Sequence, residues 1–345
     1  MCLPITPLLS PAPAQPLRFG IDVGLAGNLV PVSATTPQPI DTGKEAVPLA
    51  GLQPPHGKLV VRLNRLFWSG GESLLQQFAS EANDYANAGY DVEVQVRYQP
   101  PTTDIDNIAA WVVYVRHVVD VLGTNPDLVA LTITNEVNFD VSPNTSDGIY
   151  PGAEDALIQG IEAASDEAQQ HGWGARIRMG FTFAYRFNPA TDAQLFSYIA
   201  QNGGVPFNKA LGFVGVDDYP GTVYPPAFPP GDTAAKEMGE AIATMRDCYL
   251  PLGDIPNTVP LWVTENGFSS ANGADAPQAT ALTGMIDTVR ALSGSYNVTD
   301  YRWFNFRDND SSGTGTFDQD GLLLDTYASK PSYSLFQHEI QISTN

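Results

Sequence analysis

The chain has 345 residues, 43% of them hydrophobic, which is enough for a large core, and a formal net charge of −21. This excess of acidic residues disfavours nucleic acid as a partner, because phosphate binding needs clustered Lys and Arg. Long-range repulsion likewise disfavours an acidic polymer, so a neutral ligand is expected. No uninterrupted apolar run approaches roughly 18 residues, and the sequence therefore predicts no membrane span.

Strand-like and helix-like segments alternate along most of the chain. Strands are predicted over residues 17–24, 58–68, 91–100, 128–134, 175–183, 210–220, 260–264 and 299–306. Helices are predicted over residues 72–90, 104–123, 152–171, 192–203, 232–248, 276–292 and 331–340. Eight strands with intervening helices predict an α/β fold, a single (β/α)8 TIM barrel spanning residues 18–345.

Some parts of the chain depart from this regular alternation. Residues 1–17 are Pro-rich and lack the basic start of a complete signal peptide, so they are interpreted as a tail or as the remnant of a signal or tether. Residues 25–57 are Pro-rich without a convincing helical pattern, which predicts an irregular first βα unit. Long βα loops are also expected over 217–232 and 307–321. The last of these is rich in Asp and Gly but lacks the spacing of an EF-hand, and it is interpreted as a polar loop over the cleft.

Two apolar strands run directly into a glutamate. "LVALTITNE" ends at Glu136 and "LWVTE" ends at Glu265. Burying a lone carboxylate costs about several kcal/mol, so two such endings indicate a cleft at the strand ends. The two glutamates end the fourth and seventh predicted strands, and the active groups of a TIM barrel lie at the C-terminal ends of its strands.

Two carboxylates across a cleft are the apparatus of glycoside hydrolysis. Asn135, directly before Glu136, is placed to hydrogen-bond a sugar hydroxyl. An Asn-Glu ending strand four and a Glu ending strand seven resemble the clan of retaining (β/α)8 glycoside hydrolases that includes cellulase-like and β-xylosidase-like families. The resemblance implies that Glu136 is the acid/base and Glu265 the nucleophile, with no cofactor and no metal.

Further positions fit this resemblance. Arg62 in "VVRLN" matches an arginine that supports the nucleophile, and Tyr219 in "VDDYPG" matches a tyrosine that hydrogen-bonds it. Trp303 in "YRWFNF" matches the tryptophan that lies under the sugar beside the catalytic pair. The segment 321–337 is similar to the closing segment of many members of the clan.

One feature of the clan is missing. Many members carry a histidine near the end of strand three or strand six, where this chain reads "QVRYQP" and "VDDYPG". Arg97, Tyr98, Asp217 and Asp218 are the alternatives for the missing polar contacts, and Trp68 is a candidate for an outer sugar subsite. The predicted substrate-binding residues are Asn135, Arg62, Tyr219, Trp303, Trp68, Asp218 and Tyr98.

These observations predict a monomeric, secreted or cell-surface retaining glycoside hydrolase. It would cleave β-glycosidic bonds in a neutral oligo- or polysaccharide by double displacement. No G-x-S-x-G, Walker, HExxH or G-x-G-x-x-G motif is present, so a cofactor enzyme is not supported. Two alternatives remain: a non-catalytic carbohydrate-binding barrel, and a metal-dependent barrel enzyme with Glu136, Glu265 and Asp218 as cation ligands.

Overall fold

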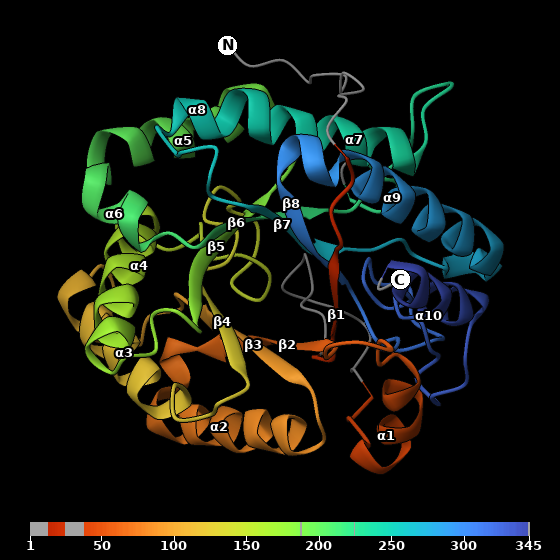
Figure 1. Ribbon diagram of the computed structural model, residues 1–345, viewed down its shortest axis with the longest axis horizontal. Helices are drawn as coiled ribbons and strands as arrows, with labels where there is room; N and C mark the ends of the chain where they lie inside the picture. Colours follow the sequence, from red (N-terminus) through yellow and green to blue (C-terminus); the bar gives the residue numbers. More distant parts are fainter. Residues whose placement is uncertain (1–12, 25–37, 187, 224, 344–345) are drawn as a thin grey trace.

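A computed structural model describes residues 13–24, 38–186, 188–223 and 225–343. Eight parallel strands form a closed barrel in chain order, β1-β2-β3-β4-β5-β6-β7-β8 (Figure 1). The strands are β1 Arg18–Asp22, β2 Val60–Phe67, β3 Asp91–Arg97, β4 Leu128–Ile133, β5 Arg178–Ala184, β6 Phe213–Asp218, β7 Leu261–Asn266 and β8 Val298–Trp303. All eight lie where the sequence predicts them, and the predicted TIM barrel is confirmed.

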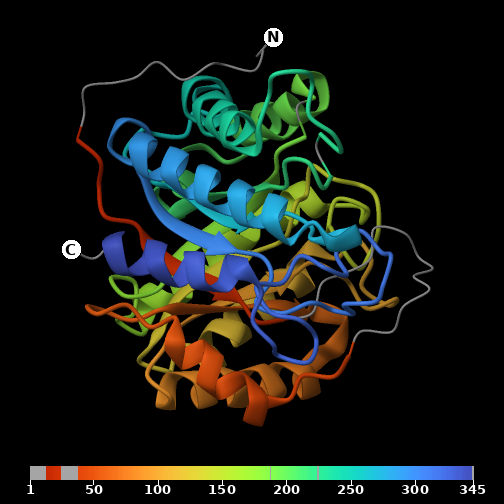
Figure 2. The same cartoon turned by 90° about the vertical axis from the view of Figure 1, so that its right-hand side faces the viewer.

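Helices surround the barrel and bury its outer face. They are α1 Thr42–Gly51, α2 Gly71–Asn87, α3 Ile108–Leu122, α4 Ala153–Gln170, α5 Pro189–Asn202, α6 Gly204–Ala210, α7 Ala234–Thr244, α8 Leu250–Leu252, α9 Asp275–Tyr296 and α10 Pro331–Ser343. The seven predicted helices are confirmed, and the short α6 and α8 were not predicted. Figure 2 shows α10 alongside α9 on the outside of the barrel.

The first crossover contains a helix that the sequence analysis missed. Helix α1 has ten residues although Pro48 lies inside it, and an interior proline costs a helix about 3 kcal/mol. The Asp41 side chain caps its N-terminus by accepting from the backbone N–H of Lys44 (3.2 Å), and Leu49 is buried. Capping and burial therefore offset the proline. Residues 25–37 of the predicted irregular unit lie outside the described residues.

The barrel interior holds buried ion pairs. Arg62 Nε of β2 lies 3.2 Å from Glu93 Oε1 of β3, and Glu93 Oε2 lies 3.1 Å from Arg302 Nε of β8. All three side chains are fully buried. Because side chains alternate between the two faces of a strand, these residues also identify the inward positions of their strands. Removing one partner would leave a buried charge unpaired, at a cost of about 3–5 kcal/mol.

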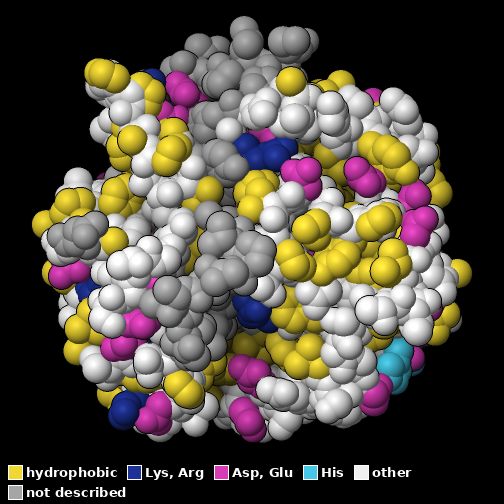
Figure 3. Space-filling model, turned by 180° about the vertical axis from the view of Figure 1, so that it is seen from behind, with side chains coloured by type: hydrophobic (Ala, Val, Ile, Leu, Met, Phe, Trp, Pro, Cys, Tyr) yellow, Lys and Arg dark blue, Asp and Glu magenta, His cyan; other side chains and the backbone are white. Residues whose placement is uncertain are grey.

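The surface of the molecule reflects its composition. Figure 3 shows Asp and Glu side chains scattered over one face, with few Lys and Arg among them. In the part of the chain that the structure describes, no helix has both the length and the apolar character needed to cross a membrane.

Candidate active site

A cavity of about 610 Å³ lies at the C-terminal ends of the strands, where barrel enzymes place their active groups. It brings together the two predicted catalytic glutamates and residues from β2 to β8 or the loops that follow them. The lining residues are Asn64, Arg65, Gln95, Arg97, Asn135, Glu136, Phe139, Asn144, Thr145, Ala184, Tyr185, Asp217, Tyr219, Val223, Glu265, Phe304 and Phe317.

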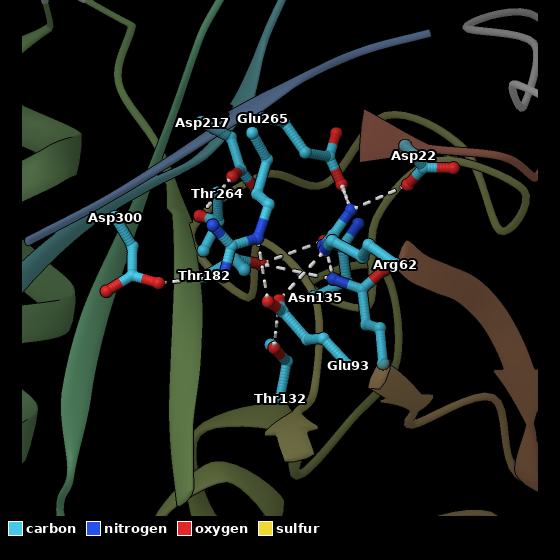
Figure 4. A network of polar contacts seen from close by, with 12 residues as sticks. Asp22, Arg62, Glu93, Thr132, Asn135, Thr182, Asp217, Thr264, Glu265 and Asp300 are labelled. Atoms are coloured by element: carbon cyan, nitrogen blue, oxygen red, sulfur yellow. Dashed lines mark hydrogen bonds and ion pairs between the residues drawn. The ribbon is translucent and has the colours of Figure 1, made fainter. Parts of the chain in front are cut away.

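Glu265 is held by two charged or polar partners. Arg62 Nη1 donates to its Oε1 (2.7 Å), and the Tyr219 hydroxyl donates to its Oε2 (2.6 Å). Figure 4 shows Arg62 between Glu265 and Asp22, whose Oδ2 also accepts from Nη1 (2.9 Å). Burial and the nearby carboxylates raise the pKa of Tyr219 well above its usual value, which keeps the hydroxyl proton available for donation. These contacts stabilise the carboxylate form of Glu265 and fix its orientation.

The backbone around Glu136 is tightly constrained. Thr134 and Glu136 have φ values of 66° and 47°, in the left-handed region that costs a non-glycine residue about 1–2 kcal/mol. The Glu136 N–H donates to Thr182 Oγ1 (3.2 Å), and the Asn135 N–H donates to Asp147 Oδ2 (2.8 Å). The fold thus stabilises an unfavourable backbone that turns Glu136 into the cavity, as strained functional sites do.

Glu136 is suited to carry a proton. Burial raises its pKa well above the usual value, and the negative charges of Asp217 and Glu265 raise it further, while Arg97 and Arg62 oppose the shift. One carboxylate oxygen from each of Glu136, Asp217 and Glu265 lies within 4.8 Å of the others. The close spacing of Glu136 and Glu265 fits the carboxyl separation of about 5–5.5 Å in retaining glycosidases, rather than the 6.5–9.5 Å of inverting ones.

Of the two adjacent aspartates on β6, the structure places Asp217 in the cavity. Its Oδ1 accepts from Thr264 Oγ1 (2.6 Å), and its Oδ2 is buried without a hydrogen bond to any described residue. Burial, followed by the charge of Glu265, raises the pKa of Asp217 well above its usual value. Asp218 is fully buried and lies away from the cavity, so the predicted substrate contact of Asp218 is not present in this geometry.

Three predicted aromatic residues also lie outside the cavity. Trp303 is fully buried and its Nε1 donates to the carbonyl of Asp320 (3.2 Å). The Tyr98 hydroxyl donates to the carbonyl of Pro151 (3.2 Å), and the Trp68 ring stacks on Tyr98 at 5.8 Å. The side chains of Trp303 and Tyr98 follow the inward-facing Arg302 and Arg97 by one residue, and alternation therefore turns them toward the helices.

The aromatic side chain that β8 supplies to the cavity is Phe304, which the sequence analysis missed. It packs edge-on against Tyr219 and Phe317, with ring centroids 5.8 and 6.0 Å away. Alternation from the inward-facing Arg302 would have pointed to this residue. These rings give the polar cavity an apolar wall of the kind that packs against the apolar face of a sugar ring.

Asn135 is fixed in the cavity next to Glu136. Its Oδ1 accepts from Thr182 Oγ1 (2.8 Å), and its Nδ2 donates to the carbonyl of Thr145 (2.5 Å). Four of the nine predicted site residues, Asn135, Glu136, Tyr219 and Glu265, line the cavity directly. Arg62 lies behind them and contacts Glu265.

Comparison of the fold with solved structures returns glycoside hydrolases. The chain matches the β-glycosidase BGL167 over 97% of its own length and 98% of that chain, with a TM-score of 0.63 and 15% identity. Two fungal β-1,4-galactanases match over 93% and 99%, with a TM-score of 0.62 and 13% identity. GH5_18 from Streptomyces cattleya, solved with GlcNAc, matches over 96% and 81%, with a TM-score of 0.65 and 15% identity.

At the level of sequence the chain stands apart from these proteins. No family model matches it, and no curated protein sequence matches it significantly. What the structural matches establish is the fold: a single (β/α)8 barrel of the type found in glycoside hydrolases.

Proposed function

We propose that the protein is a retaining glycoside hydrolase that cleaves β-glycosidic bonds in an oligo- or polysaccharide. The observation that carries the proposal is the pair Glu136 and Glu265, with carboxylate oxygens within 4.8 Å in one cavity and with different environments. Glu265 is held by Arg62 and Tyr219, whereas burial and neighbouring carboxylates raise the pKa of Glu136. Such a divergence of environments assigns the acid and the nucleophile.

In the first step, a Glu265 carboxylate oxygen attacks the anomeric carbon as the bond to the leaving oxygen breaks. Glu136 gives its proton to that oxygen, and a covalent glycosyl ester forms on Glu265. In the second step, the Glu136 carboxylate takes a proton from a water molecule that attacks the same carbon. The ester bond breaks, the sugar leaves with its original anomeric configuration, and Glu265 is again a carboxylate.

The surrounding residues assist these steps. The constrained Asn135 would hydrogen-bond a sugar hydroxyl, and Phe304 with Phe317 would pack against the sugar ring. Like the neighbours described in their titles as β-glycosidase and β-1,4-galactanases, the protein would act on carbohydrate. Its substrate is expected to be a chain without repeated acidic units, because the net charge of −21 repels polyanions. We also infer that it is a monomer acting outside the cell, where polymeric substrates are found.

The test is hydrolysis of a panel of aryl β-glycosides and polysaccharides by the wild-type protein and the Glu265→Ala and Glu136→Ala variants. NMR would follow the anomeric configuration of the first product. We expect retention, and loss of nearly all activity in Glu265→Ala. Inversion, or more than a few per cent of activity remaining in Glu265→Ala, would overturn the assignment.

A metal-dependent reaction is the second candidate. Glu136, Asp217 and Glu265 have oxygens close enough to hold one cation, and Asp217 rather than the predicted Asp218 is the third member of the set. Arg62 and Tyr219 already occupy both oxygens of Glu265, which favours the hydrolase without a metal. Loss of activity after dialysis against EDTA, restored by one divalent cation, would favour this candidate.

A further inference from the structure

The wall of the cavity formed by β2 and β3 carries two arginines that the proposed mechanism does not use. Arg65 and Arg97 both line the cavity, and both guanidinium groups lie against the same ring, with Cζ 5.1 and 5.2 Å from the Phe67 centroid. Phe67 therefore holds two like charges close together. Such an arrangement is unfavourable unless negative charge lies nearby.

The protein supplies only part of that negative charge. Arg97 Nε donates to Asp147 Oδ1 (2.9 Å), while its Nη2 is buried without a hydrogen bond to any described residue. Arg65, which is half-buried, makes no hydrogen bond or ion pair with any described residue. Burial and the charge of Arg97 lower the pKa of Arg65 to about 10. A desolvated arginine without a carboxylate partner is an incomplete ion pair.

The cavity is thus polarised. Arg65 and Arg97 lie on the side of β2 and β3, whereas Glu136, Asp217 and Glu265 lie at the ends of β4, β6 and β7. A substituent with a negative charge would be attracted to the arginines and repelled by the three carboxylates. This polarity would orient the substrate with its anionic group away from the bond that is cleaved.

We propose that Arg65 and Arg97 form a subsite for an anionic substituent of the substrate, a carboxylate or a sulfate ester on one sugar unit. Arginine is the residue best suited to this role, because its planar fork donates to two oxygens at once. Asn64, which also lines this wall and has an Oδ1 without a hydrogen bond among the described residues, would accept from an adjacent sugar hydroxyl. The inference rests on the proposed function and deepens it by naming a substrate class.

The overall charge of −21 does not contradict this subsite. At physiological ionic strength the field of an exposed charge is screened over about 8 Å, so distant acidic residues act weakly inside the cavity. The two adjacent guanidiniums dominate locally. A polyanion would still be repelled, and the substituent is therefore expected on isolated sugar units.

Binding of matched thioglycosides tests the proposal without requiring turnover. The probes are 4-nitrophenyl 1-thio-β-D-glucoside and its glucuronide, the corresponding galactoside and galacturonide, and the galactoside 6-sulfate, measured by isothermal titration calorimetry. We expect at least one anionic probe to bind about tenfold or more tightly than its neutral partner, which is the scale of one hydrogen bond to a charged group. Preference for the uronide or for the sulfate identifies which anionic group is recognised.

Variants of Arg65 separate this role from a structural one. Arg65→Gln is expected to remove the preference for the anionic probe, Arg65→Lys to retain part of it, and the surface control Arg116→Gln to leave it unchanged. Equal or tighter binding of every neutral probe by the wild-type protein would overturn the proposal. An equal loss for neutral and anionic probes in Arg65→Gln would also overturn it. A preserved preference for anions without hydrolysis of any substrate would instead overturn the proposed function alone.

Discussion

Replacing Asp217 with Asn should change the pH at which the protein loses activity. Asp217 is the nearest charge that raises the pKa of Glu136, second only to burial. Asn has nearly the same shape, so the substitution removes the charge and leaves the packing. Glu136 must be protonated in the first step, and activity therefore falls as the pH rises through its pKa. Lowering that pKa moves the basic limb of the pH profile to lower pH.

The size of the shift follows from the spacing of the carboxylates. At a separation of 4.8 Å and an effective dielectric constant of about 20, two unit charges interact with about 3.5 kcal/mol, which corresponds to about 2.5 pH units. The pKa of Asp217 is itself raised, so it carries only part of its charge in this range. A downward shift of about one to two pH units is therefore expected.

The assay is kcat/KM against pH, at constant ionic strength, with the best substrate of the aryl glycoside panel. Asp218→Asn is the matched control, because Asp218 is the adjacent buried aspartate and lies outside the cavity. It should leave the basic limb in place. If the basic limb of Asp217→Asn stays where it is in the wild-type protein, or moves to higher pH, the charge of Asp217 does not control Glu136.

Three further predictions follow from individual contacts. Tyr219→Phe removes the hydrogen bond to Glu265 (2.6 Å) and should lower kcat/KM by about 10- to 100-fold without lowering the melting temperature, whereas an unchanged rate would remove Tyr219 from the mechanism. Lys330, buried beside Asp308 at 2.5 Å, supplies an internal cation to the Asp-rich loop. Lys330→Met should therefore cost about 3–5 kcal/mol in urea unfolding, while EDTA should not change the stability of the wild-type protein. Burial raises the pKa of Glu81 to about 7, so its stabilising effect is present below the unfolded value near 4.5 and is lost as the pH rises through 7. Glu81→Gln should raise the melting temperature at pH 8 but not at pH 4, and an equal change at both would refute this.

The order of elements could be read from the sequence because it depends on local patterns. Apolar runs of strand length alternated with amphipathic helical segments, and eight such units specify a barrel. Helix α1 was missed because Pro48 obscured its pattern, whereas its cap and its buried Leu49 depend on neighbouring elements. Propensity is weaker than packing at such a position.

The predictions for individual site residues depended on the direction of each side chain. Glu136 and Glu265 were recognisable because charged groups directly after buried strands are uncommon. Trp303, Tyr98 and Asp218 each lie one residue away from an inward position, and a difference of one residue moves a side chain to the opposite face of a strand.

The sequence by itself determined the barrel, the edge at which the site lies and the pair of glutamates, since these follow from periodicity along one chain. Only the tertiary structure decided that Asp217 joins the pair, that Phe304 lines the cavity, and that Arg65 and Arg97 meet over Phe67. These contacts join residues from different strands. Their distances, burial and shifted pKa values come from the closure of the sheet, which brings distant segments together and excludes water from the charges between them.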